Sequence, residues 1–315
     1  MSDSCPVCAD ERAAGAAFCE SCGRPLATGA TKAVGADCAS CASTGTVGTD
    51  GYCENCGMLA GRPRDHVEAD AGPVAAAVTD RGIRHHRNED AMWLAVRGTD
   101  ADIVVCDGVS SSADPDVASE AAAEAAGKAL ALDATVEAAI SEAARAVADL
   151  ISAGDPRRAA SNPACTIVAA RVRDGEVTYG WVGDSRAYWI ALDGSHVEQL
   201  TEDDSWATHA IAMGADPQAA WNDPKAHAIT AWLGADAGIV RPRSATLQVT
   251  APGLLVLCSD GLWNYLTEPA AFANAVLAAV HTNPDLVSAA RALATLAVEA
   301  GGADNITVAL TPITP

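Results

Sequence analysis

The sequence predicts an α+β fold in which helices form a layer separate from antiparallel strands, preceded by two small zinc-binding units. Three observations lead to this prediction. Eight cysteines stand in four Cys-x-x-Cys pairs before residue 57. Short β-rich segments separated by turn residues follow one another over residues 166–192, which indicates antiparallel strands and not strand–helix alternation. Alanine-rich segments with helical periodicity lie on both sides of these strands.

Length and charge limit the classes of protein to consider. A chain of 315 residues is long enough for more than one domain and a sizeable core. A net charge of −21 excludes nucleic acid as the main partner, because phosphate contacts need Lys and Arg. No segment approaches the roughly 18 uninterrupted apolar residues of a membrane helix, and no secretory signal is recognisable at the start. We therefore expect no membrane association and a cytoplasmic location.

The cysteine pairs form two sets, and the second set repeats the first at an offset of 33 to 34 residues. Each set offers four thiolates, the tetrahedral shell of a structural zinc with no open position. Disulfides are disfavoured in a cytosolic chain, and redox pairs do not come in matched fours. We predict two zinc ions, which supply the folding free energy of units too small for a core of their own. The ligands are Cys5, Cys8, Cys19 and Cys22 in one set and Cys38, Cys41, Cys53 and Cys56 in the other.

These patterns divide the chain into three parts. Residues 1–57 are predicted to be tandem zinc ribbons, for which a protein partner is favoured over nucleic acid. Residues 58–73 lack periodicity and are predicted to be a linker. The second domain is predicted to span residues 74–314. Its expected elements, in order, are a strand at Val74–Val78, a helix beginning near Pro115, a helix at Ala134–Ile151, strands at Thr166–Val172, Glu176–Val182 and Ala187–Leu192, an irregular flap at Thr201–Pro224, and helices at Thr267–Val280 and Pro284–Ala300.

Three carboxylates mark the ends of further apolar runs. Asp107 follows the run 103–106, Asp260 comes just after the run 254–258, and Asp304 precedes the run 306–310. If those strands are neighbours, the carboxylates converge and form the kind of site that Mg²⁺ and Mn²⁺ prefer. Asp-Gly is also a turn signal. Asp174-Gly175 and Asp193-Gly194, however, lie between half-polar runs, whereas Asp107 and Asp260 terminate apolar ones, and that difference favours a site.

Cationic residues gather before Glu89 and Asp90. Within the seven positions 81–87 lie three arginines, Arg81, Arg84 and Arg87, and two histidines. This stretch has two interpretations: an anion site beside acidic metal ligands, or a solvated loop with compensating charges. Taken alone, the stretch favours the solvated loop.

Seven motifs of the second domain together resemble the metal-dependent serine/threonine protein phosphatases of the PP2C family, in the family's order from about residue 72 to 312. The resemblance implies an αββα four-layer sandwich of two antiparallel sheets flanked by helices. It also implies hydrolysis of phosphoserine and phosphothreonine in proteins, opposing a bacterial serine/threonine kinase. The motifs are RNEDA (87–91), VVCDGVSS (104–111), VGDSRAYWI (182–190), LTEDDSW (200–206), HAITAWLG (227–234), LCSDGLW (257–263) and GADNITVAL (302–310).

Matched motif by motif, the resemblance also implies a metal centre of two or three Mn²⁺ or Mg²⁺ ions. Asp107 would bridge two ions, and the carbonyl of Gly108 would join one of them. Asp260 and Asp304 would complete the protein ligands of the second ion, and Asp184 would help to hold a third. Water activated by two cations would attack phosphorus in line with the leaving oxygen.

The phosphate-binding part departs from the family pattern. Glu89 and Asp90 would orient metal-bound waters, but His85 stands where the family's phosphate-binding arginine is expected. Arg84 and Arg87 flank it and are candidates to replace that arginine, since a guanidinium fork matches phosphate better than imidazole does. Two alternatives stay open on this ground: an inactive scaffold that recruits partners through its zinc ribbons, and a small-molecule phosphatase.

Overall fold

The computed structural model describes residues 37–38, 41, 43–48, 51–57, 62–153 and 161–315. The chain divides into two compact units, Met1–Arg62 and Pro63–Pro315. This boundary corrects the prediction of a linker over residues 58–73. A 3-10 helix at Pro63–Asp65 and strand β1, His66–Asp70, belong to the second unit, where β1 pairs with β2 over five residues. β1 was not predicted from the sequence, because its side chains are mostly exposed and the strand has no alternation of apolar and polar residues.

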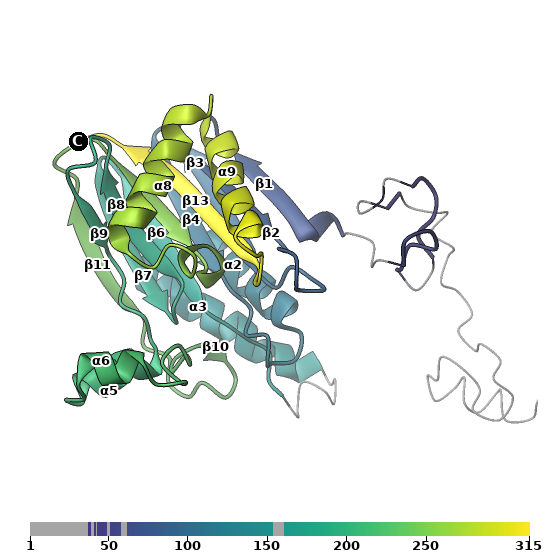
Figure 1. The fold of residues 1–315 in the computed structure, drawn as a ribbon. Helices are drawn as coiled ribbons and strands as arrows, with labels where there is room; N and C mark the ends of the chain where they lie inside the picture. Colours follow the sequence, from purple (N-terminus) through teal and green to yellow (C-terminus); the bar gives the residue numbers. More distant parts are fainter. Residues whose placement is uncertain (1–36, 39–40, 42, 49–50, 58–61, 154–160) are drawn as a thin grey trace, which may run out of the picture. The chain divides into compact units, whose positions relative to one another are not determined.

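Two antiparallel sheets form the second unit (Figure 1). The first sheet has the strand order β1-β2-β13-β12-β8-β9, and the second has the order β11-β7-β6-β4-β3. The other strands of the first sheet span the following residues: β2 Ala76–Asp80, β13 Ile306–Ile313, β12 Gly253–Cys258, β8 Arg186–Ala191 and β9 Val197–Gln199. Those of the second sheet are β11 Arg243–Gln248, β7 Glu176–Val182, β6 Ile167–Arg173, β4 Asp100–Cys106 and β3 Ala91–Arg97. A separate short pair joins β5, Ala164–Cys165, to β10, Leu233–Gly234.

Helices cover the outer face of each sheet. α8, Pro269–Thr282, and α9, Leu286–Glu299, pack on the first sheet, and α2, Pro115–Ala131, and α3, Val136–Asp149, pack on the second (Figure 1). A third apolar cluster fills the space between the sheets. The four-layer αββα sandwich is therefore confirmed.

Strand β12 shows why one apolar run serves two cores. Val256 and Cys258 face α8 and α9, whereas Leu255 and Leu257 face the other sheet, and all four side chains are fully buried. Because successive side chains of a strand point to opposite faces, a strand buried on both sides is expected to be apolar at nearly every position. The unbroken run in the sequence predicted this strand correctly.

The flap was predicted wrongly as irregular chain. Residues 206–221 contain two short helices, α5 at Trp206–Ala212 and α6 at Pro217–Trp221. Side chains cap both helices: Ser205 accepts a hydrogen bond from the backbone N–H of Thr208, and Asp216 accepts one from that of Ala219. Helices of seven and five residues are too short for helical periodicity to stand out in a polar sequence.

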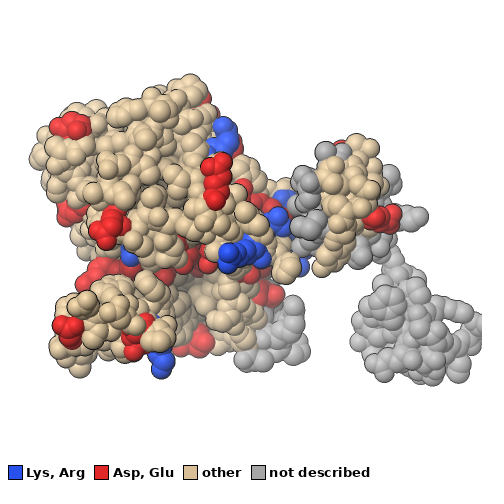
Figure 2. Space-filling view, in the orientation of Figure 1, with Lys and Arg blue, Asp and Glu red and all other residues tan. Residues whose placement is uncertain are grey.

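Two further properties concern the surface. In the view of Figure 2, acidic side chains lie between the α5–α6 segment and the sheets, in agreement with the net charge of −21. Within the described ranges, no helix combines the length and apolar character needed to cross a membrane.

Candidate metal centres

Five carboxylates from both sheets stand at strand ends. β12 and β13 are hydrogen-bonded neighbours, so the residue that follows one and the residue that precedes the other lie at the same edge of the first sheet. A short helix, α7 (Asp260–Trp263), begins directly after β12. The carboxylates are Asp90 before β3, Asp107 after β4, Asp184 between β7 and β8, Asp260 at the start of α7, and Asp304 before β13.

The mutual effect of these carboxylates on their pKa values indicates that they lie near one another. Burial raises the pKa of Asp107 well above its usual range, and the charges of Asp90, Asp260, Asp184 and Asp304 raise it further. Burial and then the charge of Asp260 raise the pKa of Asp184 to about 8. Burial and the charge of Asp304 likewise raise the pKa of Asp260 to about 6. Each carboxylate thus destabilises the charge of the others, which a bound cation would compensate.

Two carboxylate oxygens of the cluster are buried without a hydrogen-bond partner, Oδ1 of Asp90 and Oδ1 of Asp260. The other oxygen of Asp90 accepts hydrogen bonds from Ser259 Oγ and Thr307 Oγ1, both at 2.7 Å. Burial nevertheless raises the pKa of Asp90 to about 7. The second oxygen of Asp260 accepts a hydrogen bond from Asn264 Nδ2 at 3.0 Å. Buried polar atoms rarely lack partners, so oxygen donors left unpaired in this way fit a hard divalent cation.

Glu89 is fixed at both its side chain and its backbone. Ser110 Oγ donates to Glu89 Oε2 at 2.6 Å, and the backbone N–H of Glu89 donates to Asn305 Oδ1 at 2.7 Å. The backbone N–H of Gly108 donates to the Glu89 carbonyl at 3.2 Å. A Cβ atom at position 108 would lie 2.7 Å from that carbonyl oxygen and 2.6 Å from the carbonyl oxygen of Pro115. Only glycine permits this approach, which explains its place beside Asp107.

The loop of residues 81–87, called the cationic loop here, places His85 against the carboxylates, but neither Arg84 nor Arg87. His85 Nε2 lies 3.2 Å from Asp304 Oδ1, and its Nδ1 lies 3.8 Å from Glu89 Oε2. Arg84 and Arg87 are exposed, and neither forms an ion pair with any residue that the structure describes. The loop itself is anchored, because Asn305 Nδ2 donates to the carbonyls of Arg81, at 2.7 Å, and Arg87, at 2.9 Å.

Sequence reasoning missed the residues that support the carboxylates. Ser259, Thr307 and Asn305 lie inside two of the recognised motifs, but they received no role. Beneath Asp184, the Arg186 guanidinium forms a buried pair with Asp203 at 2.7 and 2.9 Å and stacks on the Trp263 ring at 3.5 Å. Trp263 Nε1 then donates to the Asp184 carbonyl at 3.0 Å. Ser259 and Asn305 each adjoin a strand-end carboxylate, Asp260 and Asp304 respectively, and this adjacency was the available signal.

The first unit brings together one of the two predicted cysteine sets. The sulfur atoms of Cys38, Cys41, Cys53 and Cys56 all lie within 4.8 Å of one another. The Cys38–Cys56 and Cys41–Cys53 sulfurs are each 3.7 Å apart. A tetrahedral zinc with bonds of about 2.3 Å places its sulfurs about 3.8 Å apart. The cluster therefore has the dimensions of a zinc site. The other set, Cys5, Cys8, Cys19 and Cys22, lies outside the described residues.

Hydrogen bonds favour the thiolate form in this cluster. Ser43 Oγ lies 2.9 Å from Cys41 Sγ, and this contact, with others from Ser43 and Asn55, lowers the pKa of Cys41 to about 6. Thr46 Oγ1 lies 3.2 Å from Cys53 Sγ and lowers the pKa of Cys53. Because the thiolate is the metal ligand, these contacts prepare the cluster for zinc.

Comparisons with known proteins agree with this geometry. Residues 81–296 match the sequence model of the family described as Protein phosphatase 2C. The serine/threonine phosphatase stp of Listeria innocua is 30% identical over 241 residues, which cover 74% of this chain and 92% of that protein.

Solved structures are similar as well. The serine/threonine phosphatase Stp1 from Staphylococcus aureus superposes with a TM-score of 0.66 at 25% identity, over 81% of this chain and 99% of that one. The catalytic domain of the phosphatase PstP, solved in complex with two manganese ions, gives a TM-score of 0.59 at 24% identity, over 79% and 99% of the two chains. The latter likeness concerns the fold alone.

Proposed function

The chain belongs to the protein phosphatase 2C family and is a serine/threonine phosphatase of that family. We propose that it removes phosphate from phosphoserine and phosphothreonine side chains of proteins, and that it uses Mn²⁺ or Mg²⁺ bound at its carboxylate cluster. The observation that carries the proposal is the convergence of five strand-end carboxylates, two of which keep a buried oxygen without a partner. Enzymes of this family use these metals. The scaffold alternative is not favoured by the comparisons, since the relatives matched are phosphatases.

We assign the metal-binding roles as follows. Asp107, the Gly108 carbonyl, Asp260 and Asp304 would hold two cations, and Asp184 would contribute to a third. The raised pKa values of Asp107, Asp184 and Asp260 support this assignment, because a cluster of carboxylates without counter-charge holds protons that a cation displaces. When bound, the cations supply a Lewis acid that activates water and neutralises charge on the phosphoryl oxygens.

Glu89 and Asp90 would orient the attacking water. Supporting this role, each has one oxygen held by a hydroxyl group of a neighbouring motif, Ser110 for Glu89 and Ser259 for Asp90. A carboxylate held at one oxygen keeps the other free to accept from water in a fixed direction.

The phosphate contact is proposed for the cationic loop. His85 lies beside Glu89 and Asp304, so its imidazole would be placed to donate to a phosphoryl oxygen of a substrate bound at the cations that the carboxylate cluster would hold. Arg84 and Arg87 are exposed and bear no carboxylate partner among the described residues, which leaves their guanidinium groups available to an incoming phosphate.

The deciding experiment uses hydrolysis of a phosphothreonine peptide by metal-stripped protein, with and without added Mn²⁺. We expect turnover only with the cation, and its loss in Asp260→Asn. Asp193→Asn is the matched control, since that aspartate belongs to another Asp-Gly pair, in the turn between β8 and β9. Full activity of Asp260→Asn, or equal losses in both variants, would refute the site. No turnover by wild-type protein with bound Mn²⁺ would refute the function.

The first unit is proposed to bind two structural zinc ions, one at each cysteine set, and to recruit a protein such as the opposing serine/threonine kinase. The sulfur geometry of the second set supports the zinc. Thiolate ligands persist in a reducing compartment, and on this ground we propose that the protein acts in the cytoplasm. Metal analysis of purified protein and capture of a kinase by residues 1–62, compared with a Cys53→Ser form, test these points.

A further inference from the structure

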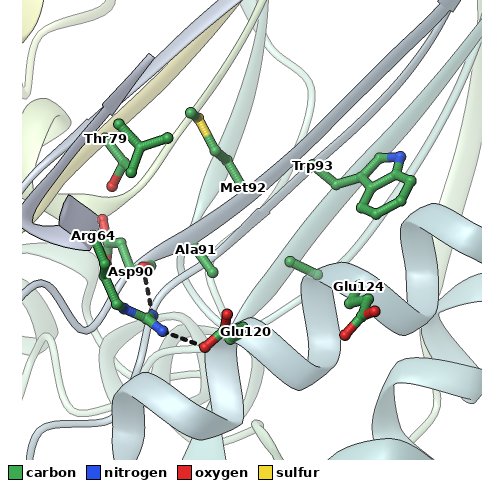
Figure 3. Close-up of a pocket in the computed structure, with 10 residues that line it drawn as sticks. Arg64, Thr79, Asp90, Ala91, Met92, Trp93, Glu120 and Glu124 are labelled. Carbon is green, nitrogen blue, oxygen red and sulfur yellow. Dashed lines mark hydrogen bonds and ion pairs between the residues drawn. The ribbon is translucent and has the colours of Figure 1, made fainter. Parts of the chain in front are cut away.

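One arginine, immediately after the boundary between the two units, grips the backbone on both sides of Glu89. Arg64 belongs to the 3-10 helix Pro63–Asp65. Its Nε donates to the carbonyl of Asn88 and its Nη2 to the carbonyl of Asp90, each at 3.1 Å. Its Nη1 forms an ion pair with Glu120 Oε2 on α2 at 2.6 Å. Figure 3 shows the guanidinium between Asp90 and Glu120.

Neighbouring polar groups complete this grip. Asp65 Oδ1 accepts from the backbone N–H of Asn88 at 3.3 Å. Asn88 Oδ1 accepts from the backbone N–H of Asp90 at 3.2 Å, and Asn88 Nδ2 donates to the Arg64 carbonyl at 3.2 Å. Ser119 Oγ accepts from Arg64 Nη2 at 3.3 Å and donates to the Glu89 carbonyl. The carbonyls of three consecutive residues, 88 to 90, are therefore all held, two of them by Arg64.

The ion pair of Arg64 with Glu120 and its hydrogen bonds to backbone carbonyls differ in strength. Glu120 keeps 67% of its side chain exposed, so its ion pair with Arg64 contributes little. Asn88 and Asp90 are buried. A hydrogen bond from a charged donor to the carbonyl of a buried residue is strong, and removing the donor leaves that carbonyl without a partner, which costs stability. Arg64 therefore acts on the backbone of the Asn88–Asp90 segment, and its charge is neutralised at the surface.

We infer that Arg64 is a positioning residue, by which the chain segment that follows the zinc-binding unit sets the orientation of Glu89 and Asp90. The inference rests on the proposed function. If Arg64 has this role, catalytic efficiency depends on a residue that lies outside the seven recognised motifs. A residue that orients a group at a metal site, without touching the metal, affects metal affinity or activity by about 10- to 100-fold when it is changed.

The test measures kcat, KM and the Mn²⁺ dissociation constant, the last by calorimetry, for full-length wild type, Arg64→Ala and Arg64→Lys. We expect kcat of Arg64→Ala to fall by about tenfold or more, Mn²⁺ affinity to fall by a similar factor, and KM to change little. Arg64→Lys should recover part of the loss, because an ammonium keeps the charge and reaches one carbonyl but lacks the fork.

Arg97→Ala and Arg97→Lys are the matched controls. Arg97 ends the strand that begins after Asp90, and it likewise pairs with a carboxylate, Asp133 at 2.8 Å, and donates to a carbonyl, that of Ala131 at 3.3 Å. These controls should keep kcat within about twofold. If Arg64→Ala does not fold, the two lysine variants carry the comparison.

Three outcomes would overturn the inference. They are equal kcat in wild type and the Arg64 variants, equal losses in the Arg64 and Arg97 variants, or a change in KM alone. Absence of turnover by the wild-type chain would overturn the proposed function as well, so the two failures are distinguishable.

Discussion

Removing the divalent cation should make the stability of the second unit fall steeply as the pH rises. In the folded, metal-free protein, burial raises the pKa of Asp90 to about 7 and, with the charge of Asp260, that of Asp184 to about 8. An unfolded aspartate titrates near pH 3.9. Because the folded state retains protons that the unfolded state has lost, this contribution to stability is fully present below about pH 4, declines as the pH rises above that value and is lost by about pH 8.

The magnitude follows from the number of retained protons. One extra proton in the folded state gives a slope of about 1.4 kcal/mol per pH unit. Counting only the proton of Asp184, whose folded pKa of about 8 lies above this range, the metal-free protein should therefore lose about 3 kcal/mol of unfolding free energy between pH 5 and pH 7. For a domain of this size, 1 kcal/mol shifts the midpoint of thermal unfolding by about 2–4 °C, so the midpoint should fall by about 6–12 °C. Saturating Mn²⁺ should remove most of this dependence, since the cation replaces the protons.

Tryptophan fluorescence is the suitable assay, because all seven tryptophans lie between positions 93 and 263 and none lies in the first unit. Loss of zinc during metal removal therefore does not enter the signal directly. Asp184→Asn should reduce the slope, whereas Asp193→Asn should not, since its carboxylate lies in an exposed turn. A metal-free midpoint that stays constant or rises from pH 5 to pH 7 would refute the reasoning.

Three further predictions concern other parts of the chain. Deleting residues 1–62 should leave turnover of a small phosphoester within about twofold, whereas deleting residues 1–66 should lower it about tenfold or more, because Arg64 and Asp65 are lost; equal activity of both forms would contradict this. Cys53→Ser should remove one zinc ion per chain in metal analysis, and unchanged zinc content would contradict the assignment. Arg84→Ala or Arg87→Ala should raise KM for a phosphopeptide about tenfold, by loss of a charge-assisted hydrogen bond; an unchanged KM in both variants would exclude these arginines as phosphate ligands.

Local pattern predicted the interior of the molecule well. The run that became β12, residues 254–258, is apolar at every position because both faces of the strand are buried. Edge elements were missed for the opposite reason. β11 is mostly polar and half exposed, so it carries no distinct apolar pattern.

The sequence by itself determined which residues have the chemistry of the site: the strand-end carboxylates, the paired cysteines and the cationic loop. These assignments depend on residue type and spacing along the chain, which the sequence contains. Only the tertiary structure decided that His85, and neither Arg84 nor Arg87, lies against Asp304. It alone showed that Arg64, 24 residues before Asn88, holds that residue's carbonyl. Such contacts join segments that are distant in sequence, and their partners are fixed by the packing of the two sheets, which no local pattern encodes.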